Sequence, residues 1–224
     1  MRFQAASDQA LLVYLGEEIG AAAHERVVQL LRLLQREPLP WVRNIQPAYC
    51  SVMITFDATA IDHAEAQAKL SEYEKRAEKL PVEGAQLVDV PVCYGGEFGP
   101  DLDDVAAKHN LSPVKVIQLH CSRTYHAYFL GFAPGFAYLG NLAKEIVTPR
   151  LETPRKTVPP GSIGIAGHQT AVYPFATPGG WRLIGRTPLD IFQKDRDPMN
   201  WIAIGDQVRF RPISQHEFLW ARRV

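Results

Sequence analysis

The chain has 224 residues and a mass of 25.1 kDa, with 46% hydrophobic and 21% charged residues. This balance excludes a wholly disordered chain, because enough apolar surface is present to bury a core. The 24 basic and 24 acidic residues cancel, which argues against a strongly basic nucleic-acid-binding protein. No apolar run approaches the ~18 residues of a membrane-spanning helix, and the N-terminal segment lacks the apolar core of a signal peptide. Three scattered cysteines fit a reducing cytoplasm better than a disulfide framework.

Charge and turn-forming residues are unevenly distributed along the chain. Residues 150–224 carry a net charge of +5, and residues 1–149 carry a net charge of −5. Two explanations stay open: chance, or a C-terminal part that meets an anionic ligand or an acidic partner. Nine of the 16 glycines lie between Gly131 and Gly185, so helices are expected in the first half and short strands with many turns in the second.

The first half of the chain predicts an α+β domain. Apolar residues recur at helical spacing over Glu17–Arg36 and Ile61–Lys79, so both segments are expected to be helices. Strands are expected at Ala10–Leu15, Val42–Gln46, Ser51–Phe56 and Gln86–Val92. The resulting order, β-α-β-β-α-β, is the ferredoxin-like plan. A boundary near Pro81–Gly84 would divide a first domain, residues 1–84, from a second, residues 85–224.

The second half predicts two short helices followed by strands. Asp101 or Asp103 is expected to cap a helix that runs to Asn110, and Ser112 followed by Pro113 predicts the start of another. Short apolar runs separated by turns then predict a compact β-barrel or sandwich, at Arg123–Phe132, Ile163–Ala166, Ala171–Tyr173, Trp181–Ile184 and Gln207–Phe210.

Several common catalytic signatures do not fit. The stretch Gly95–Gly99 lacks the Gly-Lys-Ser/Thr ending of a phosphate-binding loop, so a turn between domains is the simpler interpretation. His120 and Cys121 are adjacent and would point to opposite faces of a strand, so no metal site is expected. Ser162 is not in a Gly-x-Ser-x-Gly nucleophile elbow.

Aromatic residues are concentrated in one turn-rich segment, GFAPGFAYLG (131–140). Phe132, Phe136 and Tyr138 lie there among glycines and a proline, which local propensity does not explain. They either line an apolar pocket or fill a corner of the barrel, and the sequence leaves both interpretations open.

Basic residues follow in the next segments. Arg150, Arg155 and Lys156 lie in a proline-rich run, and Arg182 and Arg186 would share one face of a strand. Arginine matches carboxylate and phosphate groups through its planar, two-pronged fork. These residues therefore predict an anion-binding surface, with solvent-exposed loop charge as the alternative.

Four long motifs occur in order: GFAPGFAYLG, the PR-x3-PR-x2-VPPGS run from Pro149 to Ser162, IAGHQTAVYP and TPGGWRLIGRTP. Together they resemble the family of 5-oxoprolinase B subunits, also called the kinase-inhibitor or allophanate hydrolase subunit 1 family. The resemblance extends to PVCYGGEFGPDLDDVA (91–106) and GDQVRFRPI (205–213), so it spans essentially the whole chain. The sequence departs from the family pattern at Ala171–Val172, usually Gly-Ile, and at Cys50, usually arginine, so any contact made by that arginine is absent.

The resemblance implies an α+β N-terminal domain followed by a cyclophilin-like β-barrel. It also implies that the protein is not autonomous and works with a larger 5-oxoprolinase subunit of related barrel architecture, called C, and with a third subunit, called A. The complex would hydrolyse 5-oxo-L-proline to L-glutamate in the cytoplasm at the expense of ATP, whose site is not expected within this chain. Two alternatives remain: a regulatory protein that inhibits a sensor histidine kinase, or a component of a urea carboxylase or allophanate hydrolase system.

The chemistry of that reaction suggests roles for individual residues. The site must bind a small carboxylate, stabilise phosphoryl charge and position a water. Arg155 or Arg182 is expected to hold the carboxylate or a phosphoryl oxygen, and His120 or His168 is expected to transfer protons. The other residues expected to bind substrate are Phe132, Pro134, Gly135, Phe136, Tyr138 and Lys156.

Overall fold

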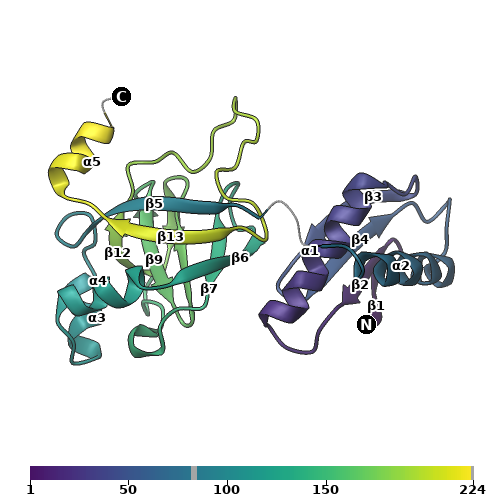
Figure 1. The fold of residues 1–224 in the computed structure, drawn as a ribbon, viewed down its shortest axis with the longest axis horizontal. Helices are drawn as coiled ribbons and strands as arrows, with labels where there is room; N and C mark the ends of the chain where they lie inside the picture. Colours follow the sequence, from purple (N-terminus) through teal and green to yellow (C-terminus); the bar gives the residue numbers. More distant parts are fainter. Residues whose placement is uncertain (82–84, 223–224) are drawn as a thin grey trace. The chain divides into compact units, whose positions relative to one another are not determined.

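The computed structural model describes residues 1–81 and 85–222. The chain divides into two compact units, Met1–Ala85 and Gln86–Val224 (Figure 1). Each unit encloses an apolar core of its own. Over the described residues, no helix combines the length and the apolar character needed to cross a membrane.

The N-terminal unit is a four-stranded antiparallel sheet, in the order β1-β2-β4-β3, packed against two helices. Buried and half-buried residues alternate along β4, so Val52, Ile54 and Phe56 face the core. Val27 and Leu30 of the first helix join the same core. The elements are β1 (Arg2–Ser7), β2 (Ala10–Tyr14), α1 (Ala21–Arg36), β3 (Val42–Pro47), β4 (Ser51–Phe56) and α2 (His63–Ala77).

Both predicted helices of this unit are confirmed, with shorter N-terminal ends. Helix α1 begins at Ala21, after Gly20, which occupies the N-cap position in an extended conformation and makes no side-chain capping hydrogen bond. Helix α2 begins at His63, and the Asp62 carboxylate accepts a hydrogen bond from the Glu65 N–H at 2.9 Å.

The ferredoxin-like plan is not confirmed. Its predicted last strand, Gln86–Val92, lies instead in the C-terminal unit, where Leu87–Tyr94 pairs with other strands of the barrel. The fourth strand of the N-terminal sheet is β1, which pairs with β2 across the turn at Asp8–Gln9. Strand β1 is an exposed edge strand with one half-buried residue, Phe3, so it carries no apolar alternation that would predict it.

The C-terminal unit is a closed barrel of seven strands, in the order β10-β7-β6-β13-β5-β12-β9. Strands β5 and β13 pair in parallel, whereas the other neighbours are antiparallel, and the hairpin of β9 and β10 completes the closure. Apolar side chains fill the interior. The strands are β5 (Leu87–Tyr94), β6 (Thr124–Leu130), β7 (Ala137–Gly140), β9 (Ser162–Ala166), β10 (Gln169–Val172), β12 (Arg182–Arg186) and β13 (Gln207–Pro212).

Short elements surround the barrel. The predicted start of α4 at Pro113 is confirmed, and the Ser112 hydroxyl accepts the Lys115 N–H at 3.2 Å. The helix predicted here is present with Asp101 at its N-cap position, but the Asp101 side chain makes no capping hydrogen bond and the helix ends at Lys108, before Asn110. The elements are α3 (Leu102–Lys108), α4 (Pro113–Cys121), the 3-10 helix η1 (Lys144–Ile146), α5 (Gln215–Ala221) and a two-stranded sheet of β8 (Arg155–Val158) and β11 (Thr177–Gly179).

Candidate functional site

The loop between β6 and β7 borders a cavity of about 350 Å³. The Gly131 N–H donates to the Phe136 carbonyl at 3.1 Å, which closes the loop on itself. Gly135 has a φ of +80°, and a Cβ atom there would lie 2.7 Å from the Cβ of Phe192. Glycine is therefore required for this loop to approach the segment that follows β12.

The cavity wall is mainly apolar. Phe132, Pro134 and Gly135, three of the predicted substrate-binding residues, come together there with Phe192. Phe132 is 62% exposed, so its ring is available to a ligand. Asn200 adds a carboxamide to the wall, and its Oδ1 atom is buried without a hydrogen-bond partner among the described residues.

Phe136 and Tyr138 belong to a cluster on the outside of the barrel wall. Leu139 faces the interior core while its neighbour Tyr138 joins this second cluster, as expected when side chains alternate across a strand. The ring of Phe136 lies 5.1 Å from Tyr173 and 5.6 Å from Trp181, centroid to centroid. Phe136 is 1% exposed, so it supports the surface rather than contacting a ligand. The outer aromatic cluster consists of Phe132, Phe136, Tyr138, Tyr173 and Trp181.

Two of the predicted anion-binding arginines are already paired with carboxylates. Arg155 Nη2 lies 2.6 Å from Asp101 Oδ1, and Arg182 Nη1 lies 2.8 Å from Asp104 Oδ2. The other oxygen of Asp101 accepts the Leu183 N–H at 2.6 Å. These contacts fasten α3 to β8 and β12, so an anionic substrate would have to displace a native ion pair to reach either arginine.

Arg150 is the arginine with an available fork. It is exposed, its Cζ atom lies 5.9 Å from the ring centroid of Trp181, and it forms no ion pair with a described residue. Burial raises the pKa of the Tyr138 and Tyr173 hydroxyls, and the charge of Arg150 opposes that rise in both. A guanidinium stacked on an indole keeps the edges of its fork open to a carboxylate.

Two further predicted residues are exposed and lie outside the cavity wall. Lys156 is exposed on β8, next to Arg155, whose side chain is turned towards Asp101. His168 is exposed in the turn between β9 and β10, where its carbonyl accepts the Leu142 N–H at 2.8 Å. The structure brings neither residue together with Phe132.

His120 lies in the barrel core and is fully buried. Its Nδ1 atom is 2.7 Å from the Tyr94 hydroxyl, and its Nε2 atom is 3.0 Å from Thr170 Oγ1. Burial lowers the pKa of His120 to about 3, so the ring is neutral at neutral pH. The inner aromatic cluster consists of Tyr94, His120, Tyr125 and Phe210.

The hydrogen bonds around His120 run in one direction. Thr170 donates its hydroxyl hydrogen to the Gly164 carbonyl at 3.0 Å, so its oxygen accepts from the His120 Nε2–H. Nδ1 is then the acceptor, and the Tyr94 hydroxyl donates to it. The Cys121 thiol, 3.3 Å from the Tyr94 oxygen, completes the chain as a donor. Both ring nitrogens of His120 are thus hydrogen-bonded to other side chains of the protein. This arrangement is typical of a structural histidine.

The glycine-rich turn at Gly95–Gly99 does not form a phosphate cradle. The Gly95 N–H donates to the Ile184 carbonyl at 3.1 Å, and the Phe98 and Gly99 N–H groups donate to the Gly95 carbonyl. These three amides are already hydrogen-bonded within the protein, so they are not directed at a nucleotide phosphate. In the part of the chain that the structure describes, no three His, Cys, Asp or Glu residues gather as a metal site.

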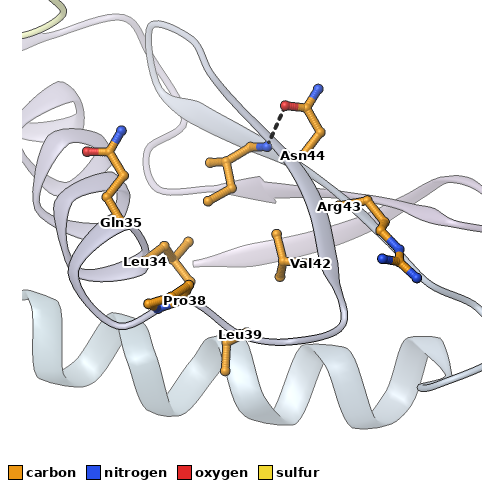
Figure 2. Close-up of a pocket in the computed structure, with 8 residues that line it drawn as sticks. Leu34, Gln35, Pro38, Leu39, Val42, Arg43 and Asn44 are labelled. Atoms are coloured by element: carbon orange, nitrogen blue, oxygen red, sulfur yellow. Dashed lines mark hydrogen bonds between the residues drawn. The ribbon is translucent and has the colours of Figure 1, made fainter.

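A second cavity, of about 310 Å³, lies in the N-terminal unit between the end of α1 and β3 (Figure 2). Its wall is largely apolar, with Leu34 and Val42 facing it, and Arg43 is paired with Asp57. The Asn44 side chain accepts the Ile45 N–H at 2.9 Å, which occupies a backbone donor of the edge strand. This cavity brings together no group suited to acid-base or nucleophilic chemistry.

Comparison with known proteins places these features in a family. A family model described as carboxyltransferase domain, subdomain C and D, matches residues 1–202. The chain is 40% identical over 221 residues to the 5-oxoprolinase B subunit of Bacillus subtilis (strain 168), covering 94% of this chain and 92% of that relative. It is also 40% identical over 210 residues to the 5-oxoprolinase B subunit of Escherichia coli O157:H7, covering 92% and 93%. The chain belongs to the family of 5-oxoprolinase B subunits.

A solved structure shares the fold of this 5-oxoprolinase family member. The crystal structure of TTHA0988 matches with a TM-score of 0.82 and 31% sequence identity, and the match covers 93% of this chain. The chain spans 40% of the length of TTHA0988. The family resemblance carried by the four sequence motifs is confirmed by these matches.

Two residues of the cavity were not predicted from the sequence of this 5-oxoprolinase family member. Phe192 and Asn200 belong to the segment between β12 and β13, where no motif marks either residue. Arg150 was one of several candidate anion-binding residues. What distinguishes it from Arg155 and Arg182 is the position of two α3 carboxylates, which only the folded structure reveals.

Proposed function

We propose that the chain is a non-autonomous component of an ATP-dependent 5-oxoprolinase, which hydrolyses 5-oxo-L-proline to L-glutamate together with the A and C subunits of that enzyme. The observation that carries this proposal is the 40% identity to a 5-oxoprolinase B subunit over 94% of this chain and 92% of the relative. The closed seven-stranded barrel supports a cyclophilin-like classification, and the free thiols of Cys50, Cys93 and Cys121 support a cytoplasmic setting.

The reaction sets a demanding task, because amide resonance makes a lactam carbonyl a poor electrophile. ATP supplies the driving force by activating the amide oxygen as a phosphate. The occupied amides of the Gly95–Gly99 turn do not fit a nucleotide, so we assign ATP binding to another chain of the complex. The contribution of this chain is then to bind and orient the lactam substrate.

The cavity and Arg150 suit that contribution. Phe132, Pro134 and Phe192 offer apolar contacts for the methylene groups of a small ring. Arg150 lies outside the cavity wall, on Trp181 of the neighbouring outer aromatic cluster, and we assign it the positive charge that attracts the substrate carboxylate to this surface. We assign this role to Arg150 in place of Arg155 and Arg182, which neutralise α3. Proton transfer by His120 or His168 stays a prediction.

The test is to co-express the chain with its candidate partner subunits and to measure 5-oxoproline-dependent ADP release together with glutamate formation. The complete mixture should be active, and the same mixture without this chain should lose activity. Equal glutamate formation without the chain would contradict the proposal. An assembled but inactive complex would favour the kinase-inhibitor or urea-related alternatives.

A further inference from the structure

The cavity below the β6–β7 loop contains a polar group that the protein leaves unsatisfied. The Oδ1 atom of Asn200 is buried and accepts no hydrogen bond from any described residue. Around it the wall consists of apolar side chains and loop backbone, including Phe132, Pro134 and Phe192. Buried acceptors are normally paired, because leaving one without a donor destabilises the folded protein. An unpaired carboxamide in an accessible cavity therefore points to a ligand.

Backbone contacts hold Asn200 in place at the cavity. Phe192 and Asn200 form a β-bridge, the Gln193 N–H donates to the Met199 carbonyl at 2.9 Å, and the Trp201 N–H donates to the Ile191 carbonyl at 2.8 Å. The terminal torsion of asparagine is broad and nearly two-fold. Because Oδ1 is enclosed in this structure, a rotation about this torsion is required to present the oxygen together with the NH₂ group to the cavity.

The chemistry of a carboxamide selects its partner. A primary amide carries an acceptor oxygen and an NH₂ donor along one edge, and it pairs through two hydrogen bonds with a group that offers the reverse pattern. A trans peptide cannot do so, because its N–H and C=O point in opposite directions. A lactam can, because ring closure forces its amide into the cis form and places N–H and C=O on the same side.

We propose that Asn200 recognises the lactam amide of the substrate through two parallel hydrogen bonds, with the ring methylenes against Phe132, Pro134 and Phe192. This inference rests on the proposed function and names the residue that selects a cyclic amide. Hydrolysis destroys the cis amide, since the product carries an ammonium group and a second carboxylate instead. The same contact therefore favours binding of the lactam and release of the opened acid.

The experiment uses the assembled complex and two ligands that differ in one group. 5-Oxoproline is the substrate, and 5-oxotetrahydrofuran-2-carboxylate, its lactone counterpart, is the matched ligand without the N–H donor. In the complex that contains Asn200→Ala, the KM for 5-oxoproline should rise by about tenfold, the effect of losing one or two net hydrogen bonds. The inhibition constant of the lactone should rise by only about threefold, because the lactone loses one of the two contacts.

A purely structural role for Asn200 would weaken both ligands equally, and that result would overturn the inference. An unchanged KM in an active complex would also overturn it while leaving the proposed function intact. Failure of the wild-type complex to consume 5-oxoproline would overturn the proposed function, and the inference with it. If Asn200→Ala does not co-purify with its partners, the wild-type complex decides alone: it must bind the lactam more tightly than the lactone.

Discussion

The inner aromatic cluster and the surface beside the outer aromatic cluster differ in whether particular polar groups are paired. In the inner cluster both nitrogens of His120 are hydrogen-bonded, and the Tyr125 hydroxyl donates to the His120 carbonyl at 2.8 Å. Beside the outer cluster, Arg150 has no ion-pair partner among the described residues, and Asn200 Oδ1 has no donor there either.

This difference separates structure from recognition. A buried polar network whose members are all paired makes a core rigid and specific, and a ligand could enter it only by breaking those bonds. A surface whose polar groups are unpaired gains free energy when a ligand supplies the missing partners. Aromatic content alone does not indicate which of the two a region is. What does indicate it is whether each donor and acceptor in the region is hydrogen-bonded within the protein.

The largest expected effect is on stability, and it tests whether the buried ring of Phe136 supports the outer aromatic cluster as a core residue would. Replacing Phe136, which is 1% exposed, by alanine should lower the free energy of unfolding by about 3–5 kcal/mol. Urea denaturation of the purified chain measures this. Phe132→Ala is the matched control: its ring is 62% exposed, so stability should change by about 0.5 kcal/mol or less. Equal losses in the two variants would contradict the division between supporting and available rings.

Acid should weaken the inner cluster selectively. The pKa of His120 is about 3 in the folded protein and about 6.5 when unfolded, so the unfolded chain binds the extra proton between these values. Its contribution to stability is complete above pH 6.5 and falls as the pH decreases towards 3, by about 2–3 kcal/mol between pH 6.5 and 4.5. Urea denaturation at several pH values in this range measures the free energy of unfolding. That free energy should fall less steeply with decreasing pH in His120→Gln than in the wild-type chain. The same pH dependence in both proteins would contradict the lowered pKa of His120 in the folded state.

The α3 carboxylates should differ according to burial. Asp101→Ala leaves Arg155 and the Leu183 N–H without their partner, and should cost about 2 kcal/mol of unfolding free energy. Asp104→Ala removes a carboxylate whose side chain is 63% exposed, so the loss should be about 0.5 kcal/mol. Thermal and urea unfolding compare the two variants. A larger loss for Asp104 would reverse the roles assigned to the two ion pairs.

The smallest expected effect is functional. Arg150→Ala should raise the KM for 5-oxoproline in the assembled complex by about tenfold, with kcat little changed, because a charge-assisted contact to the carboxylate is lost. Arg150→Lys should recover part of this loss, since charge returns without the fork. Arg2, whose Cζ lies 4.0 Å from the centre of the Tyr14 ring, is the matched stacked arginine, and Arg2→Ala should leave KM unchanged. A similar KM in all of these complexes would remove Arg150 from the site.

Much of the fold could be predicted because its signals are local. The apolar spacing of α1 and α2 and the Ser112–Pro113 start of α4 each lie within one short segment. The partners of a strand are not local. The sequence of Gln86–Val92 predicts a strand but does not show to which unit it belongs. Its place in the barrel depends on pairing with β13, far along the chain. Exposed β1 carries no core-facing alternation at all.

The site was predictable only in part, for a related reason. The composition of the glycine- and aromatic-rich loop indicated a binding site, and Phe132, Pro134 and Gly135 do line one cavity. Sequence cannot show that Arg155 is neutralised by Asp101, because the two residues are distant along the chain. Nor can it show that the polar atoms of His120 are consumed within the core. Asn200 becomes visible only when each buried acceptor is checked for a donor.

The parallel pairing of β5 with β13 bears on the order in which the protein is built. Leu87 pairs with Gln207 and Val92 with Pro212, so the first strand of the barrel is completed by a strand that leaves the ribosome after the other barrel strands. The sheet of the N-terminal unit has all of its strands within residues 2–56. Because domains tend to fold as they are synthesised, this sheet can form early. The barrel cannot pair this edge of β5 until β13 has been synthesised, so it closes later than the N-terminal sheet.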